Sequence, residues 1–171
     1  NPFALLAGAT TLLLFVTHGA VFLALKTEGV IRDRANRAAW LVGLPAALAA
    51  VAFLAWAQVL TGSPLSILAA VVAAGAFVVG LLANRVEREG LAFLGTGLAI
   101  AFAVISLFAA LFPDVMPSST DPAYSLTITN ASSTTYTLTI MTVVALIFTP
   151  IVLLYQGWTY WVFRKRVVSP P

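Results

Sequence analysis

Five long stretches of apolar residues follow one another along the chain, with polar segments between them. Each stretch approaches the roughly 20 apolar residues that an α-helix needs to cross about 30 Å of hydrocarbon. The pattern therefore predicts an all-α integral membrane protein, a five-transmembrane-helix bundle forming one domain over residues 1–171. The predicted spans cover residues 3–25, 39–60, 65–83, 91–112 and 140–163.

Short polar segments separate the first four spans and are predicted to be loops or turns. Residues 28–37 and 84–90 mix acidic and basic side chains and are expected to be loops, with Gly29 ending an extension of the first helix. Residues 62–64, with the sequence Gly-Ser-Pro, predict a tight turn.

Prolines and small residues inside the spans predict how the helices bend and meet. Pro45 and Pro150 lie within the second and fifth spans, where a lipid-embedded helix tolerates proline at the cost of a kink. Ala76 and Gly80 form a small-xxx-small pair in the third span, which favours close approach of a neighbouring helix.

Residues 113–139, between the fourth and fifth spans, are rich in Ser and Thr but also contain apolar residues. A purely flexible linker does not need apolar residues, so we expect an ordered outer loop packed over the helix ends or against a partner. Alternation over residues 126–129 predicts a short strand. Residues 130–132 match the N-glycosylation acceptor pattern, although a turn before the last helix is the interpretation that we favour.

All nine Lys and Arg residues fall on one side of the predicted membrane. They follow the first, third and fifth spans, whereas the segments after the second and fourth spans have none. Because cationic loops stay in the cytoplasm, the N-terminus is expected outside and the C-terminus in the cytoplasm. The basic residues are Lys26, Arg32, Arg34, Arg37, Arg85, Arg88, Arg164, Lys165 and Arg166.

The composition supports a membrane protein and excludes several other classes. The chain is 61% hydrophobic and 9% charged, too little polar surface for a soluble domain. The net charge of +3 comes from these basic segments, and no continuous basic face with interleaved aromatic residues predicts nucleic-acid binding. There is no cysteine for disulfides, thiolate metal sites or iron–sulfur clusters. The chain begins at Asn1 without a basic leader, so we expect a spanning first helix within a longer polypeptide.

His18 is the only histidine and lies inside the first span. An ionisable group in a membrane is costly and usually faces a bundle interior or a water path. Helical spacing places it on one face with Gly8, Thr11, Phe15 and Phe22. We favour a neutral histidine hydrogen-bonded to a neighbouring helix; the alternatives are a proton relay, a quinone contact and a haem ligand.

A cluster of aromatic and polar residues lies near the end of the fifth span. Tyr155, Gln156 and Trp158 are candidates for a quinone or partner contact, with stacked rings and a hydrogen bond from the glutamine. An interfacial aromatic belt with interhelical packing explains the same residues, and we favour it because a cationic stop sequence follows. Trp56 and Gln58 near the outer end of the second span are interpreted in the same way.

No Asp, Glu, Lys or Arg lies deep in any predicted span. Ion-coupled transporters usually place charged residues or broken helices at the bilayer midplane, so this pattern speaks against a self-contained transporter. It also removes most candidates for general acid–base catalysis. We therefore assign no catalytic residue and no metal site to the chain.

Several segments, in order along the chain, resemble the second half of subunit 2 of cytochrome bd ubiquinol oxidase. They lie near the N-terminus, in the outer loop and in the last span, while the second to fourth spans are generic. The segments are residues 1–6 (NPFALL), 17–20 (THGA), 25–29 (LKTEG), 116–122 (MPSSTDP), 125–127 (SLT), 136–142 (YTLTIMT) and 150–164 (PIVLLYQGWTYWVFR).

The resemblance implies a respiratory enzyme that oxidises a membrane quinol and reduces O₂ to water. It implies that the haems, two of type b and one of type d, belong with the main quinol site to the partner subunit 1. It further implies that this chain has a missing N-terminal half, which carries the acidic proton-pathway residue, and that the subunit is a structural and proton-pathway partner with a bound quinone or lipid. It transfers no haem ligand to His18.

We interpret the sequence as a membrane subunit of a bd-type quinol:O₂ oxidoreductase in the bacterial plasma (inner) membrane. It is expected to support the haem-bearing partner, and to line a proton or O₂ path. Two alternatives stay open: half of a permease-type transporter, and a non-catalytic membrane anchor or assembly factor.

Overall fold

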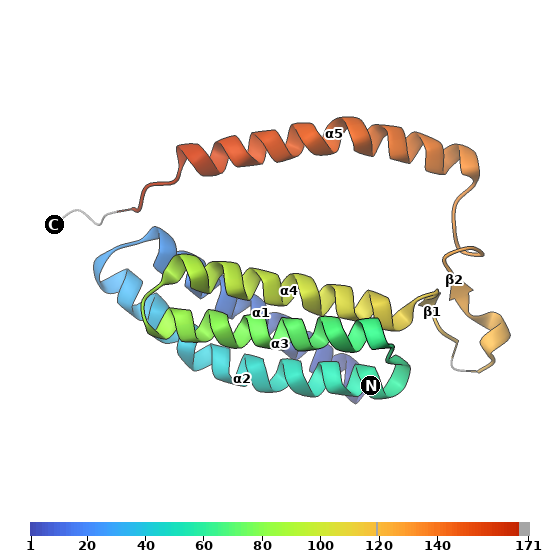
Figure 1. Cartoon of the computed structure of the whole chain (residues 1–171), viewed down its shortest axis with the longest axis horizontal. Coiled ribbons are helices and arrows are strands. Elements are labelled where there is room, and N and C mark those ends of the chain that lie inside the picture. Colours follow the sequence, from blue (N-terminus) through green and yellow to red (C-terminus); the bar gives the residue numbers. More distant parts are fainter. Residues whose placement is uncertain (119, 168–171) are drawn as a thin grey trace. The chain divides into compact units, whose positions relative to one another are not determined.

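A computed structural model describes residues 1–118 and 120–167, and the chain divides into two compact units. The first unit, called the bundle here, comprises residues 1–111 with Val167, and the second comprises residues 112–166. The described residues contain five long α-helices (Figure 1). They are α1 (Pro2–Lys26), α2 (Gly29–Thr61), α3 (Pro64–Arg85), α4 (Glu89–Leu111) and α5 (Thr135–Val162).

All five helices are long and apolar enough to cross a membrane, which confirms the predicted all-α membrane class and the five spans. Their bounds differ from the predicted spans because helices continue beyond the hydrocarbon. The side of the membrane that each end faces, and the single-domain assignment, stay predictions.

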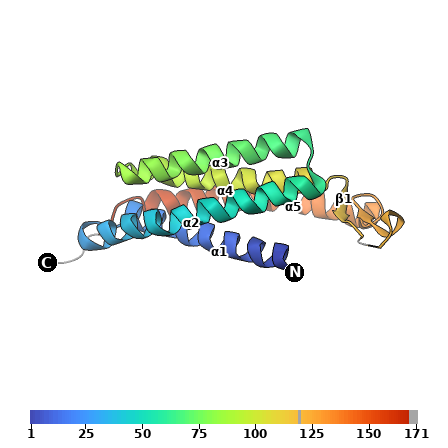
Figure 2. The ribbon, with the colours of Figure 1, turned by 90° about the horizontal axis from the view of Figure 1, so that it is seen from below.

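Helices α1 to α4 run antiparallel to their neighbours along the chain and lie side by side (Figures 1 and 2). Short links produce this arrangement. Thr27 and Glu28 join α1 to α2, and Gly62 and Ser63 join α2 to α3, as the predicted tight turn requires. Ser63 caps α3 by accepting from the Ser66 N–H at 3.2 Å.

The core of the bundle is a series of apolar layers stacked along its length. Every layer contains at least one alanine, a small residue that lets helix backbones approach one another closely. One layer lies near the end of the bundle that carries Arg32, Arg37 and Arg85, called the cationic end here, and contains Val21, Ala39, Ala83 and Ala92. The middle layer contains Ala46, Phe77, Leu81 and Ala99. The layer at the opposite end, called the far end, contains Phe53, Leu54 and Ala73.

The tightest of these approaches joins α3 to α4. A Cβ atom placed on Gly80 would lie 2.9 Å from the Thr96 backbone N, and one placed on Gly95 would lie 2.8 Å from the Gly80 Cα. These separations leave no room for a side chain. The predicted close approach at Ala76 and Gly80 is thus confirmed. Its partner is Gly95, and a Cβ atom placed on Gly95 would lie 3.0 Å from the Ala76 carbonyl oxygen.

The predicted loop at residues 28–37 is wrong, because α2 begins at Gly29. Gly29 does not end the first helix either: α1 ends at Lys26, and Gly29 starts α2 with a φ of 63°, a conformation that favours glycine. Apolar periodicity detects only the lipid-embedded part of a helix. The charged turns of α2 remain helical because Arg32 contacts the α3–α4 turn, and because the three arginines and two alanines among residues 29–38 favour a helix.

The predicted loop at residues 84–90 is likewise too long, since α3 reaches Arg85 and α4 begins at Glu89. Helix α5 begins at Thr135, five residues before the predicted span, where Thr134 accepts from the Thr137 N–H at 3.5 Å. Helices α2 and α5 each run through their internal proline.

The second unit contains a small two-stranded antiparallel sheet ahead of α5. Strand β1 (Asp114–Met116) pairs with β2 (Leu126–Thr127), and a 3₁₀ helix at Pro122–Tyr124 lies between them. The strand predicted at residues 126–129 is confirmed over its first half. Asn130 Oδ1 accepts from the Thr127 N–H at 2.7 Å, so the apparent glycosylation pattern forms a turn.

Candidate functional site

His18 lies half-buried on α1 at the contact with α4. Its Nδ1 and the Thr96 Oγ1 are hydrogen-bonded at 2.8 Å. Its ring stacks on Phe93, with the centroids 4.6 Å apart and the planes at 23°. Phe22, one turn along α1, also meets Phe93 at 5.7 Å. The hydrogen bond to a neighbouring helix that the favoured interpretation of His18 requires is therefore present.

The hydrogen bonds of the fully buried Thr96 are coupled to the tautomer of His18. The Thr96 hydroxyl also lies 2.9 Å from the Ala92 carbonyl oxygen, one turn back on α4. A hydroxyl has a single proton, so when it donates to Ala92 the His18 Nδ1–H must donate to Thr96. In that neutral tautomer Nε2 is an acceptor, and it is the only ring nitrogen left for a further contact.

The far end of the bundle, near the α2–α3 turn, carries a network of neutral polar side chains. Gln58 donates from Nε2 to the Ser106 Oγ at 3.1 Å and accepts from the Ser66 Oγ at 2.6 Å. Ser106 in turn donates to the Ser66 carbonyl oxygen at 2.8 Å, and both serines are fully buried. Gln58 thus joins α2, α3 and α4, which favours its predicted packing role.

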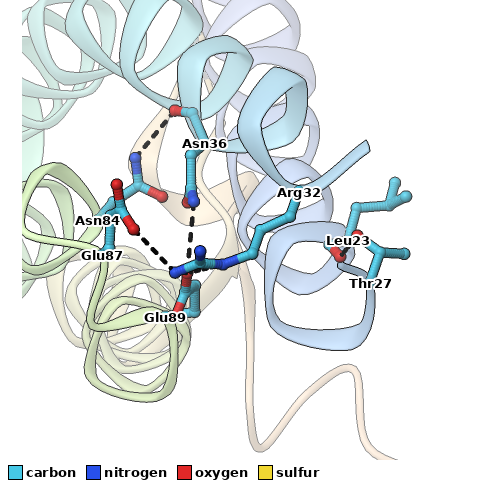
Figure 3. Close-up of polar contacts among 7 residues, drawn as sticks. All are labelled: Leu23, Thr27, Arg32, Asn36, Asn84, Glu87 and Glu89. Atoms are coloured by element: carbon cyan, nitrogen blue, oxygen red, sulfur yellow. Dashed lines mark hydrogen bonds and ion pairs between the residues drawn. The ribbon is translucent and has the colours of Figure 1, made fainter. Parts of the chain in front are cut away.

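The cationic end of the bundle carries a charged network instead (Figure 3). Arg32 donates from Nε to the Glu89 Oε1 at 2.7 Å and from Nη2 to the Glu87 Oε2 at 3.0 Å. Asn36 donates to the same Glu89 oxygen at 3.3 Å, and Asn84 donates to the Asn36 carbonyl oxygen at 3.0 Å. Glu89 is only 4% exposed, so its charge is compensated inside the network.

Two cavities open in the bundle. The larger, of about 270 Å³, is lined mainly by α2 and α3, with contributions from α1 and α4, and its lining is apolar apart from Gln58. The smaller, of about 100 Å³, is lined in part by Thr10, Thr11 and Phe15 of α1. The Thr10 hydroxyl is buried and makes no hydrogen bond within the described chain, so a water molecule in this cavity would satisfy it. His18 lines neither cavity.

The candidates Tyr155, Gln156 and Trp158 lie on α5 in the second unit, and each is exposed. The local contacts recorded near them are the Thr159 hydroxyl donating to the Tyr155 carbonyl oxygen at 3.0 Å and Arg164 stacking on Trp161 at 4.7 Å. The quinone or partner contacts predicted for these residues, and separately for His18, stay predictions.

Sequence reasoning missed several of the polar residues that organise the bundle. Thr96, Ser66 and Ser106 are fully buried and bridge helices, yet none breaks the apolar pattern strongly. The signal that could have found them is a small polar residue inside a membrane helix, where hydrogen bonds commonly cross to a neighbour. Among residues 1–118 and 120–167, no group of three or more His, Asp or Glu side chains is placed to hold a metal ion.

Comparison with known proteins places this arrangement in context. Residues 1–163 match the family described as cytochrome bd terminal oxidase subunit II. The chain is 37% identical to cytochrome bd ubiquinol oxidase subunit 2 of Bacillus subtilis (strain 168), over 98% of this chain and 51% of that protein. It is 31% identical to cytochrome bd-I ubiquinol oxidase subunit 2 of Escherichia coli (strain K12), over 99% of this chain and 54% of that protein.

A third relative is the probable cytochrome oxidase subunit 2 of Haemophilus influenzae (strain Rd), which is 32% identical over 94% of this chain and 51% of that protein. The chain thus spans about half the length of the curated relatives that it matches.

Proposed function

The chain belongs to the cytochrome bd terminal oxidase subunit II family, and from this premise we propose that it acts as part of the second subunit of a bd-type quinol:O₂ oxidoreductase. The observation that carries the proposal is the extent of the match. It covers residues 1–163, so it includes the outer loop and α5 as well as the bundle. An apolar helix pattern alone would not extend through a polar loop.

Within this enzyme the chain supplies a rigid membrane scaffold for a haem-bearing partner, subunit 1. Support comes from the packing of the bundle, in which the Gly80–Gly95 contact fixes α3 against α4. The neutral network around Gln58 and the charged network around Arg32 bind the helices at the two ends. Such a bundle presents its outer faces in a fixed orientation to a partner or to lipid.

The residues of this chain do not fit a haem, so we place haem b and haem d in subunit 1. His18 is the only histidine, and its ring is packed against Phe93. It lines neither of the two cavities. No redox step is therefore assigned to side chains of this chain.

A bound quinone or lipid belongs to the proposal as a ligand of the outer faces. Tyr155 and Trp158, three residues apart on α5, share one helix face and are exposed, which suits stacking on a ring or against a partner helix. Gln156, next to Tyr155 in sequence, is also exposed and has an amide that can donate to a quinone carbonyl oxygen. A missing N-terminal half of the subunit is a second candidate to cover this face.

A proton or O₂ path through the bundle is the finer part of the proposal. The cavity beside Thr10 supports it, because a buried hydroxyl without a protein partner favours an ordered water inside the membrane. The larger, apolar cavity would accept O₂. We place the whole assembly in the bacterial plasma membrane, as a multi-pass subunit of a respiratory chain.

The proposal is tested by purifying the protein from its native membrane through a tag on this chain. We expect co-purification of a partner subunit whose reduced-minus-oxidised spectrum contains haem b and haem d, together with quinol-dependent O₂ consumption. Purification without a haem-bearing partner would contradict the proposal. Full oxidase activity in membranes from which this chain is deleted would favour a dispensable anchor instead.

A further inference from the structure

Four exposed arginines at the cationic end of the bundle, Arg34, Arg37, Arg85 and Arg88, have no carboxylate partner among residues 1–118 and 120–167. Arg32 pairs with both Glu87 and Glu89. The acidic groups of the α3–α4 turn are thus paired with Arg32, which leaves the guanidinium groups of Arg37 and Arg85 available to a ligand of opposite charge.

Trp40 lies against Arg85 and, by helical spacing, next to Arg37. The Arg85 Cζ, from the end of α3, lies 4.8 Å from the centroid of the Trp40 ring on α2. Arg37 precedes Trp40 by three residues, so the two side chains are neighbours on the surface of α2. A guanidinium stacked on a ring keeps the N–H groups at its edge free to donate. Indole rings favour the boundary between hydrocarbon and headgroups, which sets the depth of this pair.

The larger apolar cavity lies along the same α2–α3 contact. Its lining includes Val78, Phe77 and Ala74 of α3. With a rise of about 1.5 Å per residue, Val78 lies roughly 10 Å and Ala74 roughly 16 Å along the helix from Arg85. Half of the hydrocarbon core is about 15 Å thick. A chain of one leaflet whose headgroup lies at Arg85 therefore reaches the cavity.

We propose that this surface binds one anionic phospholipid. Its phosphate lies between Arg37 and Arg85, its glycerol lies at the level of Trp40, and one acyl chain runs along α2 and α3 into the apolar cavity. The charge of the two free guanidinium groups selects an anionic headgroup, and planar N–H donors suit phosphate oxygens. The cavity lining of alkyl and aromatic groups suits an acyl chain. This inference does not rest on the proposed function.

The test counts lipids on the whole complex purified in detergent, by native mass spectrometry with added dioleoyl phosphatidylglycerol or dioleoyl phosphatidylcholine. We expect one phosphatidylglycerol to be retained with clear preference over phosphatidylcholine. Arg85→Gln should weaken that binding about fivefold, and the double change Arg37→Gln with Arg85→Gln about 25-fold, as expected for loss of one and two interfacial cations. Equal retention of the two lipids would overturn the proposal.

Arg34→Gln is the matched control, because it removes the same charge from the same helix at about 9 Å from Trp40 along the axis, against about 4.5 Å for Arg37. We expect it to change phosphatidylglycerol binding less than twofold. An equal loss in this control would show general surface attraction and overturn the specific site. Arg85→Lys keeps the charge and should retain most of the binding. Retained binding in this variant would show that the loss in Arg85→Gln comes from the missing charge and not from misfolding.

The acyl-chain part of the site is tested separately. Ala74→Leu narrows the cavity without changing charge, and we expect it to weaken dioleoyl phosphatidylglycerol several-fold while leaving dihexanoyl phosphatidylglycerol unaffected. Inorganic phosphate at the same concentration should not compete. Displacement by inorganic phosphate, or equal affinity for the short-chain lipid, would mean that only the phosphate is recognised and would overturn the lipid assignment. A complex with a protein chain seated on this face and no retained lipid would also overturn it.

Discussion

The two sides of α4 are held by different kinds of contact. Toward α3, Gly80 and Gly95 bring the two backbones together with no side chain between them. Toward α1, the contact is made by side chains, with His18 stacked on Phe93 and hydrogen-bonded to Thr96. One side is a close fit of surfaces, and the other consists of a few directional interactions.

This difference follows from what drives association in lipid. The hydrophobic effect contributes little between membrane helices, so they associate through van der Waals packing and interhelical hydrogen bonds. The α3 side of α4 relies on van der Waals packing, and the α1 side adds an interhelical hydrogen bond. A bulky side chain added on the α3 side should therefore lower the free energy of unfolding strongly. Loss of a polar group on the α1 side should lower it only modestly.

The largest expected effect is that of Gly80→Leu. The added side chain would meet the α4 backbone at Thr96 and Gly95, so α3 and α4 must separate, at a cost of about 3 kcal/mol in the free energy of unfolding. Denaturation of the purified complex in mixed micelles would measure this loss. Gly75→Leu on the same helix is the control, since no atom lies within 4 Å of its added Cβ, and a similar loss there would contradict the backbone-contact explanation.

An intermediate effect is expected for His18→Ala, which removes both the stacking on Phe93 and the hydrogen bond to Thr96. We expect a loss of about 2 kcal/mol in stability, with lower yield of assembled complex. Turnover per assembled enzyme should change less than the yield. A large fall of turnover in fully assembled, haem-replete complex would instead favour a proton relay at His18.

A smaller effect is expected for Thr96→Val, which keeps the shape of the residue but removes its hydroxyl. The His18–Thr96 hydrogen bond should contribute about 0.6 kcal/mol, and at most about 1.7 kcal/mol, as such bonds do between membrane helices. A double-mutant cycle with His18→Ala in the same unfolding assay isolates this coupling. A coupling energy near zero would show that the bond adds nothing to the α1–α4 contact.

The smallest effect is expected for Gly97→Ala. The added Cβ would lie 3.6 Å from the His18 Cε1, an ordinary van der Waals contact on the α1 side. Stability should change by less than about 0.5 kcal/mol, because a methyl group fits there without moving a backbone. A destabilisation as large as that of Gly80→Leu would mean that both sides of α4 are equally tight, and the distinction between them would be lost.

Much of the fold could be predicted from sequence because membrane helices leave a strong signal. The five spans follow from uninterrupted apolar length, and the Gly80 contact follows from small-residue spacing. The partner Gly95 could not be chosen, since α4 offers Gly90, Gly95 and Gly97 and spacing does not say which one faces α3.

The charged turns of α2 and the bridging role of Thr96 were harder to predict for physical reasons. Apolar periodicity reports contact with lipid, whereas residues 29–38 are helical outside it and are held through Arg32 by residues more than fifty positions away. The partner of His18 is 78 residues distant in sequence. Such pairs depend on the rotation of each helix, which small changes in packing decide.

The short turn between α3 and α4 has a consequence for how the protein is made. Only Val86, Glu87 and Arg88 separate the two helices, and their tightest contact joins residues 15 positions apart, Gly80 and Gly95. Contacts between near neighbours close quickly, with little loss of chain entropy. We therefore expect the α3–α4 hairpin to form as soon as α4 leaves the ribosome, before the synthesis of α5 is complete.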